Sequence, residues 1–398
     1  MQQQEQKDIS AAMVWLMATA TGLIVANLYY AQPLVGPISR ATGLDPGAAG
    51  LIVTLTQMGY CLGMLFIVPL GDLVENRKLI VTALAGTACA LAVAAFSTSA
   101  ALFLVAMFCI GVGSVAAQII VPFASHLSRE ETRGQTVGTV VSGLLLGIML
   151  ARPVASLVTD ASNWHVIFVL SAVVTAGLAL VLQRRLPRRD PADESNSQQI
   201  SYPALLASLW HLLKTTPILR RRSAYQFCMF GAFSLFWTTV PLILASPAFG
   251  LSQTGIAIFA LVGVAGALVS PLAGRRADQG KSRSTTAMAL VAGVLSFAVP
   301  LLLHGGRTFE LGVLVAASIV LDSAVSASLV TGQRAIYALS ADVRSRLNGL
   351  YMAIFFLGGA LGSSVGGWMY AHHGWQGVLM TGLMFPAAGL LVFSTERR

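Results

Sequence analysis

The stretch ETRGQTVGTVVSGLLLG (residues 131–147) has a counterpart later in the chain, DVRSRLNGLYMAIFFLGG (342–359). In both, a charged segment containing an arginine, Arg133 or Arg344, leads into an apolar run that contains glycines. Matched loop motifs at matched positions along a chain are hard to produce by chance. The repeat therefore predicts a protein built from two related halves, with any binding site lying between them.

Composition places both halves in a membrane. The 398 residues are 56% hydrophobic and 10% charged, with a mean hydropathy of +0.75, whereas soluble domains carry about 25% charged residues. Apolar runs bounded by charges or turn residues predict spans at 11–35, 48–70, 79–97, 100–124, 135–159, 163–183, 223–245, 252–273, 285–303, 310–332, 347–369 and 375–394. We therefore expect an all-α integral membrane protein with 12 transmembrane helices in two six-helix, pseudo-symmetric bundles.

The positions of the charges predict orientation and domains. All but three of the 25 Lys and Arg residues fall on one side of the predicted spans, the exceptions being Arg40, Arg152 and Arg307. By the positive-inside rule both termini are cytoplasmic, which makes the net charge of +9 a matter of membrane topology and argues against nucleic acid as a partner. We expect an N-terminal bundle (1–186), a cytoplasmic linker with an interfacial helix (187–221) and a C-terminal bundle (222–398).

Two loops resemble the cytoplasmic loop motif of the major facilitator superfamily. The loop GDLVENRKLI (71–80) follows the second span, and GRRADQGK (274–281) follows the eighth. In that family the loop forms a cytoplasmic latch that is made in one conformation and broken in another. The resemblance implies a cytoplasmic gate comprising Gly71, Asp72, Glu75, Arg77, Lys78, Arg133, Gly274, Asp278 and Arg344. The alternative is that these charges only orient the helices.

Longer stretches resemble the sugar, nucleoside and drug efflux branch of that superfamily, which contains 12-span drug:proton antiporters. They are ANLYYAQPL (26–34), TLTQMGYCLGMLFIVPLGD (54–72), GLLLGIMLARP (143–153) and QRAIYALSADVRSRLNGLYMAIFFLGGALGS (333–363). Two positions depart from the antiporter pattern. Met107 stands where many members have an arginine, and Arg152-Pro153 replaces the usual Gly-Pro.

Asp322 is the only acidic residue predicted to lie deep in a span, and Arg152 is the only deep basic residue. A charge within the membrane is costly, so both are candidates for proton coupling or for an ion pair. Asp322 would carry the proton or contact a substrate amine or hydroxyl. The structural alternative is a neutral, hydrogen-bonded carboxyl group.

The family fold implies a cavity lined by spans one, four, seven and ten. Polar and aromatic residues of these spans, with one from span two, are the candidate substrate contacts: Asn27, Tyr30, Gln32, Gln57, Gln118, Trp237 and Thr238. For Tyr29 and Tyr30 an interfacial anchoring role is equally compatible with their place near a span end.

The expected function is secondary active transport in the cell inner (plasma) membrane, namely proton-driven efflux of a drug-, sugar- or nucleoside-like molecule by alternating access. Proton-coupled uptake is the first alternative, and a membrane-embedded sensor or receptor is another. The expected partners are the small-molecule substrate, protons and the lipid bilayer, with the protein a monomer. No phosphate-binding loop, catalytic grouping or metal-ligand spacing of the four cysteines is found, so neither enzyme activity nor a cofactor is expected.

Overall fold

Helices account for every regular element in the described chain. The computed structural model describes residues 9–188, 201–264, 269–339 and 343–396, except the side chains at positions 270, 271, 277 and 278. The first half contains α1 (Ala11–Ala26), η1 (Gln32–Leu34), α2 (Val35–Thr42), η2 (Pro46–Ala48), α3 (Leu51–Phe66), η3 (Val68–Asp72), α4 (Asn76–Phe96), α5 (Ala100–Ser114), α6 (Ala116–Leu127), α7 (Arg133–Ala161) and α8 (Trp164–Arg185). The rest contains α9 (Tyr202–Thr215), α10 (Pro217–Ala245), α11 (Gln253–Val262), α13 (Ser270–Asp278), α14 (Ser282–Leu302), α15 (Arg307–Tyr337) and α16 (Arg344–Ser394).

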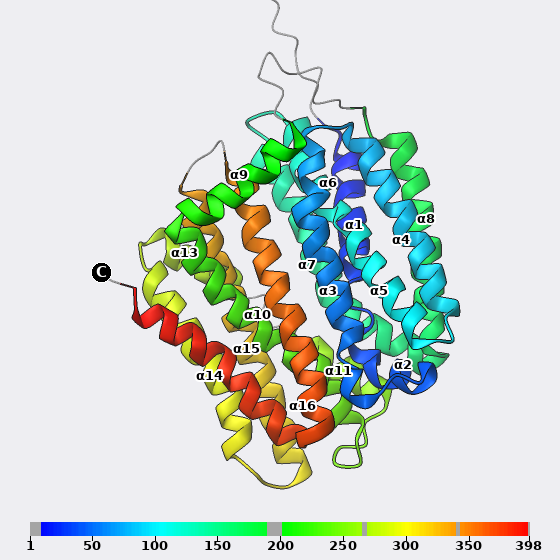
Figure 1. Ribbon diagram of the computed structural model, residues 1–398, viewed down its shortest axis with the longest axis vertical. Coiled ribbons are helices and arrows are strands. Elements are labelled where there is room, and N and C mark those ends of the chain that lie inside the picture. Colours follow the sequence, from blue (N-terminus) through cyan, green and yellow to red (C-terminus); the bar gives the residue numbers. More distant parts are fainter. Residues whose placement is uncertain (1–8, 189–200, 265–268, 340–342, 397–398) are drawn as a thin grey trace, which may run out of the picture.

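These helices confirm the predicted all-α membrane fold. Within the described ranges, nine helical segments are long and apolar enough to cross a bilayer, and Ala11–Ala26 and Gln253–Val262 are shorter apolar helices. One of the nine, α16, consists of two helices that meet at Gly374, whose φ of 61° only glycine adopts readily. The two sets of helices lie side by side in Figure 1, the first in blue through cyan to the green of α8, and the second in green to red.

The first span is not the continuous helix that its hydropathy predicts. Between Asn27 and Leu34, several backbone amides bond carbonyls three residues back rather than four, as in Leu28 N–H to Val25 O and Gln32 N–H to Tyr29 O. Pro33 lacks an amide hydrogen and cannot continue the α-helical pattern. The break positions the Gln32 side chain in the protein interior, where it is fully buried.

Glycines bring equivalent helices of each half into backbone contact. A Cβ at Gly147 of α7 would overlap the backbone of Gly22 in α1, and Gly143 makes a similar approach to Ala18. In the second half α10 and α16 meet in the same way, at Gly231, Gly358 and Gly362. Small residues at such crossings permit the close van der Waals packing that holds membrane helices together.

Gly147→Ala is expected to lower the thermal stability of the detergent-purified protein. The added methyl group has no room against the Gly22 backbone, and overpacking of this kind costs about 1–3 kcal/mol. Gly138→Ala, on the same helix with open space around its Cα, is the matched control and should leave the unfolding temperature unchanged or slightly raised. Equal unfolding temperatures for the two variants would contradict the close crossing.

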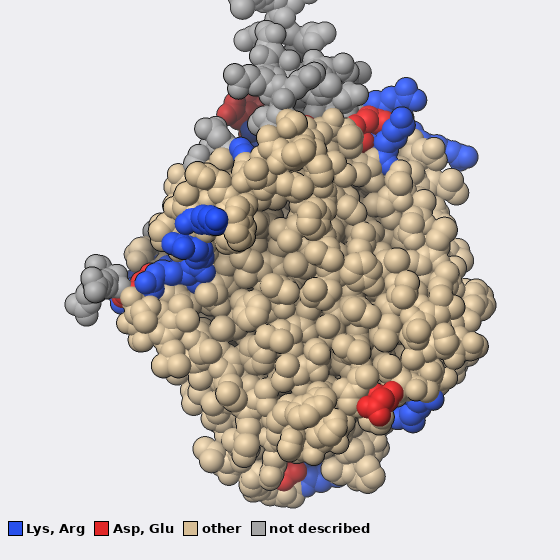
Figure 2. All heavy atoms as spheres, viewed as in Figure 1, with Lys and Arg blue, Asp and Glu red and all other residues tan. Residues whose placement is uncertain are grey.

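Charged residues gather at two opposite ends of the molecule. On the face shown in Figure 2, most Lys and Arg lie toward the end that carries α9 and the C-terminus, and a few charged residues mark the end near α2. The band between them is uncharged, as a lipid-facing surface requires. We refer to these as the α9 end and the α2 end.

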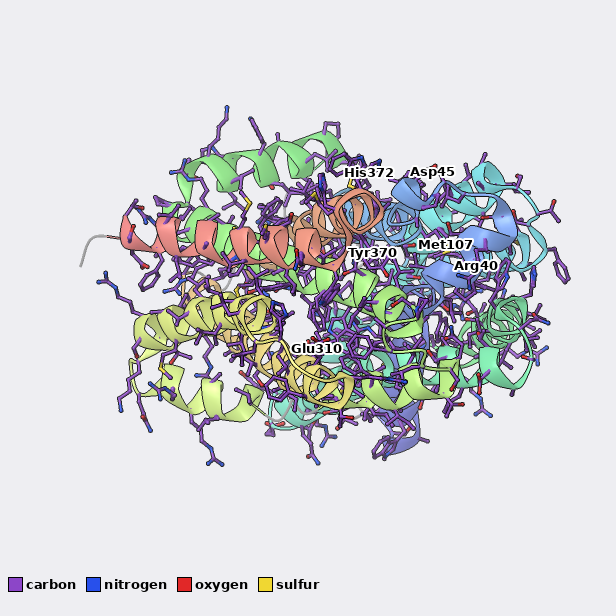
Figure 3. All side chains as sticks on the ribbon, turned by 90° about the horizontal axis from the view of Figure 1, so that it is seen from below. Arg40, Asp45, Met107, Glu310, Tyr370 and His372 are labelled. Atoms are coloured by element: carbon purple, nitrogen blue, oxygen red, sulfur yellow. The ribbon has the colours of Figure 1, made fainter. Side chains whose placement is uncertain are left out.

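The halves are sealed together at the α2 end. Thr54 of α3 bonds Ser363 of α16 at 2.8 Å, and a Cβ at Gly50 would overlap the Ser363 carbonyl. Nearby, Thr254 donates to the Asp160 carboxylate across the second interface, between α11 and α7. Figure 3, viewed from this end, shows Asp45 of the first half and His372 of the second at the junction.

At the opposite end α9 links the two halves. The Tyr202 hydroxyl donates to the Phe66 carbonyl of the first half at 2.8 Å, and Arg346 of the second half donates to Ser208 at 3.0 Å. A pocket lies beside α9, lined by Leu209 of α9 and by residues of α3, η3, α6 and the start of α16, including Met64 and Pro122.

Candidate functional site

A chain of contacts through one tryptophan connects the two deep charges. The Trp237 indole N–H donates to Asp322 Oδ1 at 2.9 Å, and the Arg152 guanidinium lies 4.5 Å from the centre of the same ring. Arg152 is 5% exposed and Asp322 7%. In the part of the chain that the structure describes, no direct ion pair joins them. The site thus brings together α7 of one half and α10 and α15 of the other.

Aromatic rings surround the Arg152 guanidinium. Besides Trp237, the rings of Tyr29 and Phe233 have their centres 5.1 and 5.0 Å from it, and Phe259 packs edge-on against the indole at 6.0 Å. Each desolvated cation–π contact is worth up to about 2 kcal/mol. The rings therefore offset part of the cost of burying a charge that forms no ion pair with the described carboxylates.

Gln32 provides the polar partner of Arg152. Its Oε1 accepts a hydrogen bond from Arg152 Nε at 2.7 Å. Two buried donors beside this bond, Arg152 Nη2 and Gln32 Nε2, have no partner in the described structure. The interrupted first span is what brings the Gln32 amide to this position.

The other predicted cavity residues are buried at separate points. Gln57 of α3 donates to Ser234 of α10 at 3.0 Å and so connects the two halves. Gln118 donates to the Tyr60 hydroxyl at 2.9 Å, and Ser171 donates to Asn27, both within the first half. The Thr238 hydroxyl is buried without a partner among the described residues, and Tyr30 lines a groove between α1 and α7.

Three residues of the site were not singled out from the sequence as contacts: Phe233, Ser234 and Ser171. One signal was present, because Phe233 and Trp237 are four residues apart and so share a helix face. Met107, at the position of the missing arginine, is fully buried in the apolar core (labelled in Figure 3) and adds no charge to the site.

Polar contacts are seen for three of the predicted gate residues, Glu75, Arg77 and Arg344. Glu75 pairs with Arg77, two residues along the chain, at 3.4 Å, and Arg77 also donates to the Leu186 carbonyl. Arg344 donates to the Tyr337 carbonyl at 3.0 Å. The other gate positions are placed as follows: Gly71 and Gly274 are buried, Asp72, Lys78 and Arg133 are exposed, and the side chain of Asp278 lies outside the described residues.

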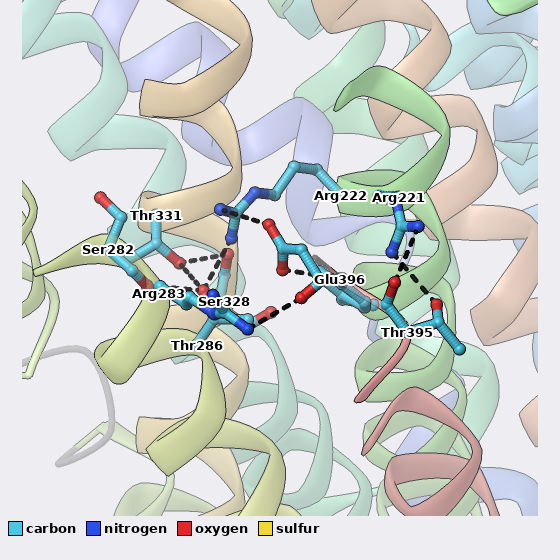
Figure 4. A network of polar contacts seen from close by, with 10 residues as sticks. Arg221, Arg222, Ser282, Arg283, Thr286, Ser328, Thr331, Thr395 and Glu396 are labelled. Atoms are coloured by element: carbon cyan, nitrogen blue, oxygen red, sulfur yellow. Dashed lines mark hydrogen bonds and ion pairs between the residues drawn. The ribbon is translucent and has the colours of Figure 1, made fainter. Parts of the chain in front are cut away.

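A second polar network lies at the α9 end of the C-terminal half, away from the Arg152–Asp322 site (Figure 4). Glu396 accepts a hydrogen bond from Tyr225 and pairs with Arg222 at 4.0 Å, while its carbonyl accepts from Arg283 at 2.8 Å. Arg222 also donates to Thr286. These contacts tie the end of the last span to α10 and α14, which is a structural role.

Comparison with known proteins agrees with this architecture. The family model described as Major Facilitator Superfamily matches residues 14–309 and 226–398. The chain is 40% identical over 386 residues to the "Uncharacterized transporter YgaY" of Escherichia coli O157:H7, covering 97% of this chain and 96% of the relative. It is 32% identical to the "Probable transporter SCO4007" of Streptomyces coelicolor, covering 91% and 82%.

Two solved structures share the fold at low identity. A crystal structure of the nucleoside transporter NupG has a TM-score of 0.76 at 17% identity, covering 96% of this chain and 99% of that one. A bacterial homologue of the human lysosomal transporter Spinster, in an inward-facing and occupied conformation, has a TM-score of 0.75 at 12% identity, with 96% of each chain covered.

Proposed function

We propose that this chain, which belongs to the Major Facilitator Superfamily, is a proton-driven exporter of a small organic molecule. It is a membrane transporter, and the proposal adds the direction, the coupling ion and the kind of cargo: a drug-, sugar- or nucleoside-like compound. The observation that carries it is the contact chain from Arg152 through Trp237 to Asp322, which joins the two halves at buried charges. A carboxyl group at such a junction can exchange its proton for a substrate.

The mechanism is alternating access between the two halves. Packing of α3 against α16 closes the α2 end, and the pocket beside α9, lined by residues of both halves, lies at the other end. Protonation of Asp322 removes its charge and weakens its hold on a bound cationic or hydroxyl group. Proton and substrate then compete for one carboxylate, which is the requirement for antiport.

The proposed setting is the bacterial inner membrane, with both termini and α9 in the cytoplasm and the protein acting as a monomer. The gathering of Lys and Arg toward the α9 end supports this orientation, since cytoplasmic segments carry the excess of positive charge. The gate residues of the two loops are proposed to close this end in the opposite conformation.

Proton-coupled uptake is the second candidate, and the free donors beside Arg152 favour it. An anion bound at Arg152 would neutralise the arginine and so favour protonation of Asp322. Substrate and proton would then travel together as a symport.

The sign of proton movement distinguishes the two mechanisms. The protein is reconstituted in liposomes that contain a trapped pH-sensitive dye, and drugs, sugars and nucleosides are added outside without an imposed pH gradient. Antiport predicts that an entering substrate makes the lumen more alkaline, whereas symport predicts acidification. Uptake of labelled substrate with no change in lumenal pH would exclude proton coupling.

A further inference from the structure

Two buried hydrogen-bond donors beside the Arg152–Gln32 bond have no partner in the described structure. Nη2 of Arg152 and Nε2 of Gln32 belong to side chains that are already joined by the Nε–Oε1 bond, so these donors lie close together. Leaving such a donor buried and unpaired costs about 1–3 kcal/mol, and more for a charged group. Both groups donate, and one is cationic. The group that completes this spot is therefore an acceptor with negative charge, such as a carboxylate.

An acidic group, the Asp322 carboxylate, contacts the same indole ring. Asp322 uses Oδ1 to accept from Trp237, and Oδ2 has no hydrogen bond within the described residues. Oδ2 faces Gly263, where a Cβ would lie only 2.6 Å away, so the absent side chain leaves room for the carboxylate. The group that completes this side is a donor with positive charge, such as an ammonium.

The two charges contact the same indole, Arg152 over the ring and Asp322 at its N–H, and they are opposite in sign. A purely cationic molecule would be attracted by Asp322 but repelled by the positive charge of Arg152. A purely anionic molecule would be attracted by Arg152 but repelled by Asp322. A molecule that carries both an acid and an amine keeps the site electrically neutral. Charges brought together in a medium of low dielectric are tolerated only when they are paired in this way.

We propose that the substrate is a small zwitterion of the α-amino-acid type. Its carboxylate binds Arg152 and Gln32, and its ammonium binds Asp322. The rings of Tyr29, Phe233 and Trp237 select an apolar or aromatic side chain. This inference rests on the proposed antiport, because the ammonium and the proton compete for the same carboxylate.

The test compares molecules that differ by one charge. The purified protein is heated with L-leucine, L-methionine, L-phenylalanine, L-tyrosine or L-tryptophan, and with analogues of each that lack the amine or the acid. For phenylalanine these are 3-phenylpropionate and 2-phenylethylamine. At least one amino acid should raise the unfolding temperature, since a compound that binds only the folded state stabilises it. Its two analogues should bind at least tenfold more weakly, because each loses a charged hydrogen bond.

Variants separate the two ends of the ligand. Arg152→Gln should bind the intact amino acid and the analogue without the acid almost equally. Asp322→Asn should bind the intact amino acid and the analogue without the amine almost equally. The inference is wrong if an acid or an amine alone stabilises the wild type as well as the zwitterion, or if no amino acid stabilises it. The wild-type comparison decides even where a variant fails to fold.

The liposome assay keeps this inference separate from the proposed function. If the protein exchanges protons for a compound that is not a zwitterion, the proposed function holds and the zwitterion inference is wrong. If the protein binds amino acids as described but moves no protons, the zwitterion site is supported and proton-driven export is wrong.

Discussion

Asp322→Asn is expected to abolish proton movement by the reconstituted protein while leaving the fold intact. Asparagine is nearly isosteric with aspartate and keeps an oxygen that can accept from the Trp237 indole, so the local packing survives. It cannot gain or lose a proton. Since no other acid of the sequence is predicted to lie deep in a span, a proton relay has no alternative carboxylate there. The lumenal pH signal should fall to that of empty liposomes.

Glu310→Gln is the matched control for this experiment. Glu310 lies on the same helix, α15, but in its first turn, where its carboxylate accepts from the Gly305 amide. The substitution removes one carboxylate from α15 without touching the site and should leave the pH signal unchanged. Wild-type proton movement in Asp322→Asn, at equal protein levels, would remove Asp322 from the mechanism.

The spans were predictable because hydropathy is a property of whole segments. A run of about 20 apolar residues specifies a membrane helix whatever it packs against. The break after Ala26 was not predicted, although Pro33 marked it, because the run stays apolar throughout. The junction at Gly374 likewise depends on a backbone conformation that composition does not record.

The site was predictable only in part, for a related reason. Asp322 and Arg152 stand out because ionisable residues are rare in apolar spans. Which helix faces meet is not encoded in that contrast, since a span that is apolar all round has no polar face to orient it. The indole of Trp237 as the link between them, and the role of Gln32, required the positions of three helices. Trp237 and Gln32 were candidates from the sequence, but the residues that they contact were not predicted.

The seal at the α2 end gives the second large effect. Alternating access requires this end to open, and here it is closed by α3 and α16, where Gly50 lies against the backbone of Ser363 and Gly367. Gly50→Ala places a methyl group where no space exists in the closed arrangement. A cost of about 1–3 kcal/mol falls on that arrangement alone.

Such a cost shifts the balance between conformations about 5- to 150-fold toward opening of the α2 end. Spin labels at Ala41 and His373, which are exposed on opposite halves at this end, report the change as a longer distance in pulsed electron resonance. The background lacks the four native cysteines, Cys61, Cys89, Cys109 and Cys228. The rate of transport by Gly50→Ala should also fall, because the protein rarely returns to the state in which the α9 end accepts substrate.

Gly86→Ala is the control, since Gly86 lies in α4 with open space around it. It should change neither the spin-label distance nor the rate of transport. An unchanged distance in Gly50→Ala would show that the seal yields without opening, and the α3–α16 contact would then not govern access. A longer distance with transport retained would instead place the rate-limiting step elsewhere in the cycle. The combination expected here, opening with loss of transport, ties the backbone contact at Gly50 to the conformational change that exposes Asp322 and Arg152 to the other side of the membrane.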